Sequence, residues 1–132
     1  MNKVDSPMRF KDNGDGTVTN LNTGLMWQQQ DDDVPRTWQE AVDYSKSLSL
    51  SGHKDWRLPT IDELKTLVDI EHRPTIDPIF IGTKRLSYWS STTDAYDASY
   101  AWHVNFYYGN VGNYNKTFGY YVRCVRLGEP VK

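Results

Sequence analysis

The chain has 132 residues, which is the usual size of a single domain. Its 15 Lys and Arg against 17 Asp and Glu give a formal net charge of −2, which excludes a broad electrostatic attraction to nucleic acid or to an anionic membrane. No apolar run approaches the roughly 18 residues that cross a bilayer, and the single cysteine, Cys124, excludes an internal disulfide, so packing alone must hold the fold.

The first part of the chain, residues 8–28, predicts a short β-meander. Asn13-Gly14 and Asp15-Gly16 supply the positive-φ positions of a tight hairpin, and a second turn precedes the short apolar run Leu25–Trp27. The acids around Gly14 do not have the spacing of a calcium-binding loop. We therefore expect a hairpin turn here.

Two capping boxes predict two helices. Thr37-x-x-Glu40 and Thr60-x-x-Glu63 each pair a hydroxyl with a carboxylate that can satisfy free N–H groups at a helix start. Gly52 is the expected stop of the first helix. The expected buried stripes are Trp38, Ala41, Val42, Ser45 and Leu48 in the first helix, and Leu64, Leu67 and Val68 in the second.

The connecting segments have simpler interpretations. In the link before the second helix, Trp56 and Leu58 should be buried while Arg57 pairs with an acid of that helix. The run Asp31–Asp33 is expected to be a solvated loop rather than a metal site. Residues 71–86 contain two prolines and a glycine and are expected to be irregular.

The last third predicts strands again, at 88–92, 101–108 and 120–126. Alternation places Trp102, Val104 and Phe106 on a buried face, and His103, Asn105 and Tyr107 toward solvent. Cys124 should be a buried, unreactive side chain of the closing strand. The order of strands, two helices and strands predicts an α+β class, in one domain over residues 1–132 with its core at about 8–127.

Four motifs in order carry a family resemblance. They are Asp12–Thr19 with Thr23–Trp27, Asp55–Thr60 with Glu63-Leu64, Tyr88–Thr93, and Tyr121–Arg126. Together with Ala101-Trp102, they resemble the C-terminal-domain family of the collagen-like adhesin Lcl, from Phe10 to Arg126. The resemblance implies a C-type-lectin-like fold, related to that of the formylglycine-generating enzyme, with antiparallel β-hairpins and extracellular binding of glycans or other surface molecules.

One departure from that family concerns its disulfide. In relatives, a cysteine after the aromatic residue of the first helix could pair with the cysteine of the closing strand. Here Tyr44 is followed by Ser45, so Cys124 is left single. The resemblance to extracellular relatives therefore comes without their disulfide.

The stretch from about Asp94 to Asn115 is the predicted binding surface. Eight of the nine tyrosines lie between 88 and 121, mixed with Asn, Asp, Ser and His, a composition found in antibody paratopes. It also resembles the variable region of proteins that are diversified by retroelements on a C-type-lectin-like scaffold. The predicted ligand contacts are Asp94, Tyr96, Asp97, Ser99, Tyr100, His103, Asn105, Tyr107, Asn110, Asn113, Tyr114 and Asn115.

Three functional classes stay open. The leading hypothesis is a surface-displayed, adhesin-like module for a protein or glycan ligand, with no metal and no cofactor. The alternatives are an enzyme on a formylglycine-generating-enzyme-like scaffold, for which no convergent titratable constellation is visible, and an assembly domain that forms a homo-oligomer through its aromatic face. Lys116 is the only basic residue of 94–121, which disfavours nucleic acid as a partner.

Overall fold

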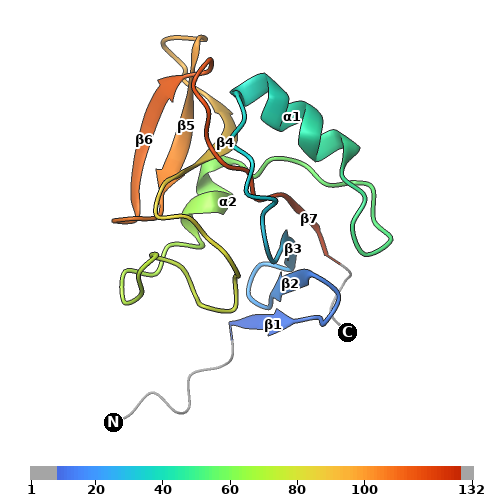
Figure 1. Cartoon of the computed structure of the whole chain (residues 1–132). Helices are drawn as coiled ribbons and strands as arrows, with labels where there is room; N and C mark the ends of the chain where they lie inside the picture. Colours follow the sequence, from blue (N-terminus) through green and yellow to red (C-terminus); the bar gives the residue numbers. More distant parts are fainter. Residues whose placement is uncertain (1–8, 129–132) are drawn as a thin grey trace.

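A computed structural model describes residues 9–128, which form two antiparallel sheets and two helices (Figure 1). The first sheet has the order β1-β2-β3-β7 and the second the order β4-β5-β6. The predicted α+β class, with two helices and antiparallel hairpins, is confirmed. The elements in chain order are β1 (Phe10–Asp12), β2 (Thr17–Asn20), β3 (Leu25–Gln28), α1 (Trp38–Ser47), α2 (Ile61–Lys65), β4 (Ser87–Thr93), β5 (Tyr100–Asn105), β6 (Asn110–Asn115) and β7 (Val125–Leu127).

The hairpin between β1 and β2 forms as predicted. Gly14 and Gly16 have φ values of 77° and 92°, which only glycine adopts without strain. The acids of this loop serve the turn itself: Asp12 accepts the N–H of Gly14 at 2.9 Å, and Asp15 accepts the hydroxyl of Thr17 at 2.6 Å. These carboxylates are thus engaged in holding the turn.

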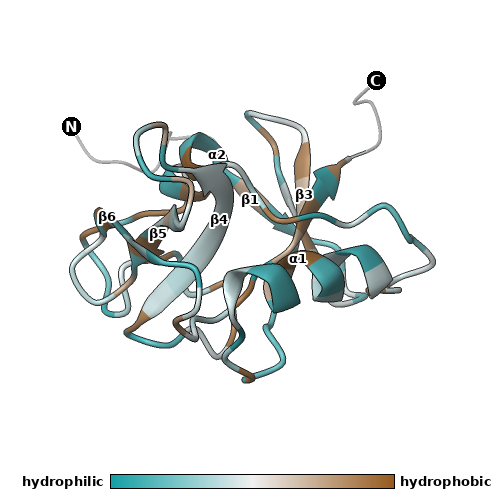
Figure 2. Ribbon diagram, turned by 90° about the horizontal axis from the view of Figure 1, so that it is seen from above, coloured by the Kyte–Doolittle hydropathy of each residue, from teal (hydrophilic) through white to brown (hydrophobic). Residues whose placement is uncertain are grey.

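Strand β4 lies between the two helices, which flank it on opposite sides (Figure 2). Tyr88 packs in a cluster with Leu64 of α2, and the next residue, Trp89, packs in a second cluster with Ala41 of α1. Both aromatic side chains are fully buried. Consecutive residues of a strand point to opposite faces, so burial of both requires a covering layer on each side of the sheet.

Both predicted capping boxes are present. The Thr37 hydroxyl accepts the N–H of Glu40, the Thr60 hydroxyl accepts that of Glu63, and each glutamate accepts the threonine N–H in return. The predicted end of α1 was wrong. The helix ends at Ser47, and Gly52 (φ 79°) instead forms a tight turn that joins Leu50 to His53.

The link before α2 forms as predicted. Trp56 and Leu58 are buried, and the Arg57 guanidinium binds both carboxylate oxygens of Glu63 at 2.8 and 2.9 Å. Glu63 also accepts the N–H of Thr60 at 2.9 Å. One carboxylate therefore both caps the helix and ties it to the link.

The Asp31–Asp33 run is not a solvated loop throughout. Asp31 is buried because its carboxylate accepts the Tyr88 hydroxyl and forms an ion pair with Lys84 at 3.2 Å. The other two acids, which are exposed, pair with Arg36 and with Lys84. Each of the three acids has a cationic partner, and only Asp31, which also accepts the Tyr88 hydroxyl, lies in the core.

Arg123 is the largest charged side chain of the core and is fully buried. Its guanidinium donates to the carbonyls of Gln28 and Gln29 at 2.7 and 2.6 Å, and to the Thr83 hydroxyl at 2.7 Å. The Asp31 carboxylate lies 3.8 Å away. One side chain thus joins the end of β3 to the segment that enters β4.

The closing segment differs from the predicted strand. Only 125–127 forms β7, whereas Tyr120 and Tyr121 make isolated bridges to Arg36 and to Tyr88. Cys124 is fully buried as predicted, and burial raises the pKa of its thiol to about 12. The thiol is therefore protonated and inaccessible at neutral pH.

The capping boxes should contribute measurably to stability. Thr37→Ala and Thr60→Ala should each lower the free energy of unfolding by about 1 kcal/mol, because each removes the acceptor of a free helix N–H. Denaturant titration measures the change, with the exposed Ser49→Ala as control. Unchanged midpoints in both variants would contradict the caps.

Loss of the buried guanidinium should cost more. Arg123→Met should destabilise the domain by about 3–5 kcal/mol, since it leaves carbonyls and a carboxylate without their buried partner. Arg85→Met, on the surface, should stay within about 0.5 kcal/mol of wild type. Similar unfolding midpoints for the two variants would show that Arg123 is not a structural centre.

Candidate binding surface

The predicted contact residues do not form one face. The register pairs Ala101 with Tyr114 and His103 with Gly112, and these residues face α1; the residues between them face α2. The side toward α1 holds His103, Asn105, Asn110 and Tyr114, and the side toward α2 holds Tyr100, Asn113 and Asn115. Asp94, Tyr96, Asp97 and Ser99 lie in the β4–β5 loop, and Tyr107 lies in the β5–β6 turn.

The solvent-facing prediction for His103 was wrong. Only 8% of the residue is exposed, because the segment 116–121 folds back over this face and packs the tilted Tyr120 ring against the imidazole at a centroid distance of 4.8 Å. The Trp89 ring lies 6.3 Å from the imidazole and 4.7 Å from Tyr120, so the three rings form one cluster. Gly112 leaves room for the ring, since a Cβ there would lie 3.1 Å from it.

Trp102 also departs from the prediction. Its neighbours Val104 and Phe106 are buried, but Trp102 is only half-buried. The half of β5 that carries Val104 packs in the cluster under α2, and Trp102 is not among that cluster's residues. Alternation therefore predicted the face of this side chain correctly but not its degree of burial.

The β4–β5 loop is ordered by its own polar side chains. Asp94 accepts the N–H of Tyr96 at 2.7 Å and the side-chain amide of Asn113. Asp97 accepts the N–H and the hydroxyl of Ser99 at 3.0 and 2.6 Å, and these bonds lower the pKa of its carboxyl. The carboxylates thus hold turns, and Tyr96 is left fully exposed at the tip.

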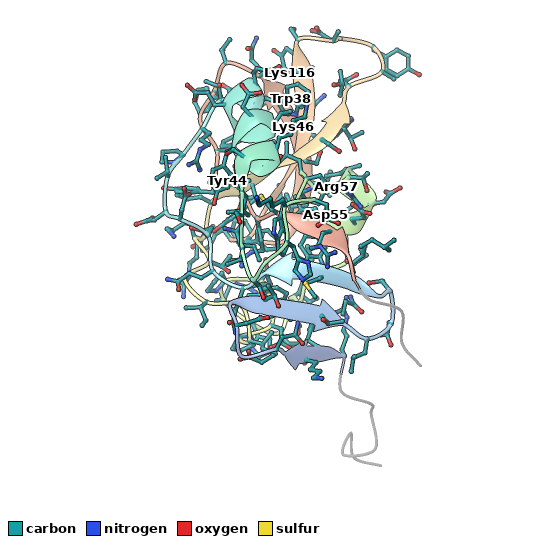
Figure 3. All side chains as sticks on the ribbon, turned by 90° about the vertical axis from the view of Figure 1, so that its right-hand side faces the viewer. Trp38, Tyr44, Lys46, Asp55, Arg57 and Lys116 are labelled. Atoms are coloured by element: carbon teal, nitrogen blue, oxygen red, sulfur yellow. The ribbon has the colours of Figure 1, made fainter. Side chains whose placement is uncertain are left out.

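Lys116 closes the same end of the sheet. Its ammonium lies 4.0 Å from the centre of the Trp38 ring and donates to the Thr93 hydroxyl at 3.0 Å. Figure 3 shows Lys116 and Trp38 side by side at the amino end of α1. This contact fixes the start of the segment that covers His103.

Three rings form a surface row on the side toward α1, which we call the aromatic row: Tyr114, Phe118 and Tyr120. Phe118 lies 4.6 Å from Tyr114 and 5.7 Å from Tyr120, between ring centroids. Tyr114 and Phe118 are 43% and 50% exposed, while Tyr120 rests on Trp89 at 4.7 Å. The row is therefore exposed at its top and supported from below by the core.

A groove of about 430 Å³ runs beside the aromatic row. Phe118, Tyr120 and Tyr121 supply its aromatic wall, and Asn105 and Ser87 supply a side-chain amide and a hydroxyl 3.4 Å apart. Its remaining lining residues are Pro35, Leu86 and Gly119. This combination of apolar wall and a few polar groups is typical of a ligand site.

The sequence identified only part of this surface. Asn105 lines the groove, and Tyr114 and Asn110 share its side of the sheet. The aromatic run Phe118–Tyr121 lay just beyond the predicted stretch and could have been included on composition alone. Pro35 and Leu86 carry no sequence signal, because they reach the groove only through the tertiary fold.

Two further observations limit the chemistry of residues 9–128. No group of three or more His, Cys, Asp and Glu side chains in this range could hold a metal ion. No helix in the same range is both long enough and apolar enough to cross a membrane.

A family match covers most of the described residues. Residues 16–126 match the family described as Lcl C-terminal domain. The chain belongs to the Lcl C-terminal domain family. Lcl C-terminal domains are an adhesin-type family, and this chain is accordingly an adhesin-related surface module. A search of curated proteins finds no match.

The buried histidine of this Lcl-type domain should make its stability depend on pH. Burial lowers the pKa of His103 to about 4, from 6.5. The unfolded chain then binds more protons between these values, so stability is complete above about pH 6.5 and falls as the pH drops toward 4. We expect about 2 kcal/mol to be lost between about pH 7 and about pH 5.

His103→Phe keeps an aromatic ring under Tyr120 but cannot titrate. This variant should lose most of the pH dependence when unfolding is followed by denaturant titration at both pH values. Equal pH dependence in the variant and the wild type would show that other groups cause it.

Proposed function

We propose that the domain binds a protein or glycan ligand on a surface, through the groove and the aromatic row. The main support for this proposal is that Tyr114 and Phe118 are 43% and 50% exposed next to a groove of about 430 Å³. Exposed aromatic rings that gather beside a concave site are costly to leave in water and are enriched in binding surfaces. Adhesin-type family membership supports the same function.

The rigidity of this surface supports a binding role. Tyr120 packs against both Trp89 and His103, and its main chain exchanges two hydrogen bonds with Arg36, at 2.7 and 2.9 Å. The Trp89 indole donates to the Arg36 carbonyl at 2.9 Å. A ligand would therefore meet side chains that are already ordered, which reduces the entropy lost on binding.

The polar groups of the groove suit recognition rather than catalysis. The Asn105 amide offers both a donor and an acceptor, and the Ser87 hydroxyl offers the same. Such groups orient hydroxyl, amide or carbonyl groups of a ligand, whereas proton transfer needs a titratable group with a tuned pKa. The imidazole of His103 lies beneath the surface, next to Tyr120.

Two other depressions have similar volumes but weaker chemistry for this role. One, of about 420 Å³, lies between Val42 and Leu58 and has no aromatic residue in its lining. The other, of about 390 Å³, has Phe80 as its one aromatic residue, and that residue is buried. The three sites have similar volumes, so we choose between them by their exposed aromatic surface, which favours the groove beside the aromatic row.

Diversification by a retroelement is the finer hypothesis for this surface. Its support is the Tyr/Asn composition of 94–121, including Tyr96 at the fully exposed loop tip and Tyr107 at 42% exposure. Sequencing the neighbouring DNA tests it directly. A near-copy of the coding region for 94–121, differing at adenines and lying beside a reverse transcriptase gene, is expected; a locus without either would refute it.

The binding surface can be tested with single substitutions. Tyr114→Ala and Phe118→Ala should each weaken binding by about 2 kcal/mol, which is roughly 30-fold, because each removes an exposed ring from the contact area. Panels of immobilised glycans and displayed peptides would find a ligand, and calorimetry would measure its affinity. Melting temperatures should change little, since both rings are about half exposed.

The matched control is Ile70→Ala. Ile70 is 70% exposed but is not part of the groove lining, so its loss removes apolar surface without touching the site. Wild-type affinity in both aromatic variants, or an equal loss in the control, would show that the ligand binds elsewhere.

A further inference from the structure

The outer edge of β6 is an unpaired strand edge. Figure 1 shows β6 at the side of the molecule, with β5 as its neighbour on the inner side. Within residues 9–128, no other strand pairs with β6. A strand in this position presents a row of free N–H and C=O groups to solvent.

The hydrogen-bond pattern identifies the outward groups. The Lys116 N–H donates to the Ser99 carbonyl at 2.8 Å, which makes this pair a hydrogen-bonded one in the β5–β6 ladder. Bonded pairs recur at every second residue, so Tyr114, Gly112 and Asn110 point their main-chain groups toward β5. The main-chain groups that point outward belong to Val111, Asn113 and Asn115, and of these the Asn115 carbonyl already accepts the Phe118 N–H at 3.0 Å.

The composition of β6 leaves this edge unprotected. Its sequence, Asn-Val-Gly-Asn-Tyr-Asn, contains no charged residue and no proline, the residues that natural proteins use to block edge pairing. The edge strands of the first sheet differ, because β1 carries Lys11 and Asp12 and β7 carries Arg126. A protected sheet and an unprotected sheet thus coexist in one domain.

We propose that β6 pairs antiparallel with β6 of a second copy of this chain, about a two-fold axis at Asn113. The three outward residues are symmetric about Asn113, so Val111 faces the partner's Asn115 and Asn113 faces the partner's Asn113. The Asn113 pair exchanges two main-chain hydrogen bonds. Each Val111–Asn115 pair adds one, from the Asn115 N–H to the Val111 carbonyl, because the Asn115 carbonyl already accepts the Phe118 N–H at 3.0 Å. The pairing therefore forms about four main-chain hydrogen bonds. A neutral strand avoids the like-charge repulsion that a two-fold axis otherwise imposes.

Side chains favour a copy of the same chain over an unrelated strand. The proposed register sets Tyr114 opposite the partner's Gly112, and an aromatic ring next to a cross-strand glycine covers the backbone that the glycine exposes. The same register brings the turn of Tyr108, which is 65% exposed, toward the partner's Phe118, which is 50% exposed. The interface is self-complementary, as two-fold symmetry requires.

The pairing has a consequence for binding that rests on the proposed function. Edge-to-edge antiparallel pairing continues one sheet through both protomers, so its two-fold axis is perpendicular to the sheet. Both grooves then open on the same side of the dimer. Two sites that face one way can engage a surface together, and avidity exceeds the affinity of either site.

Proline substitution at the edge tests the dimer without any ligand. The Asn113 N–H points away from β5, so Asn113→Pro removes an edge donor and leaves the β5–β6 ladder in place. Asn113→Ala is the matched control, since it also loses the side-chain bond to Asp94 but keeps the N–H. Sedimentation velocity over a concentration series should show reversible dimers for wild type and Asn113→Ala, and a dissociation constant raised more than about tenfold for Asn113→Pro.

A disulfide test covers the case in which the proline variant does not fold. Only position 113 meets its own copy in this register, at a Cα separation of about 5.5 Å that suits a disulfide. Asn113→Cys should therefore cross-link to itself under mild oxidation, and Asn110→Cys should not; the buried Cys124 does not compete. A monomeric wild type, an unaffected proline variant, or equal cross-linking at 110 and 113 would overturn the proposal.

Discussion

The burial of the Arg123 guanidinium is the constraint on which the arrangement of the domain depends. A planar cation with five donors cannot enter a core unless oxygen atoms surround it. Here they come from the carbonyls at the end of β3, from Thr83 ahead of β4, and from the nearby Asp31. The two sheets share no strand, so this side chain fixes how the end of one meets the start of the other.

The groove is a consequence of the same closing segment. Before it reaches Arg123, the chain passes over the sheet face that carries His103 and runs alongside β4, where Tyr121 and Trp89 share a main-chain hydrogen bond of 3.0 Å. This path buries His103 under Tyr120 and places the aromatic row at the surface. It also forms the groove, which Leu86 lines on its other side. Stability and the candidate site therefore depend on one stretch of about ten residues, 116–126.

Local patterns in the sequence predicted much of the fold. Most of the wrong predictions concern side chains whose burial depends on contacts with distant segments. Capping boxes, the glycine turn between β1 and β2 and the Arg57–Glu63 pair depend on neighbours a few residues apart, and each formed as expected. The helix stop predicted at Gly52 was the local signal that failed. The exposure of His103 and of Asp31 depended on partners from distant segments, Tyr120 and Tyr88, which no local pattern reveals. The candidate site shows the same limit: composition singles out the stretch in the sequence, but only the strand register shows that its side chains divide between two faces of the sheet.

The route of the chain also determines how the domain would carry mechanical load. The described chain enters through β1 and leaves through β7, which are the two edge strands of the first sheet, whereas the groove lies on the second. A pulling force applied on the carboxyl side of the described residues would first reach the β3–β7 ladder and then the hydrogen bonds of Arg123. A pulled guanidinium must break several short, buried bonds together before the segment over His103 can lift. The side chain that sets the packing of the sheets would then also resist mechanical unfolding from this side of the domain.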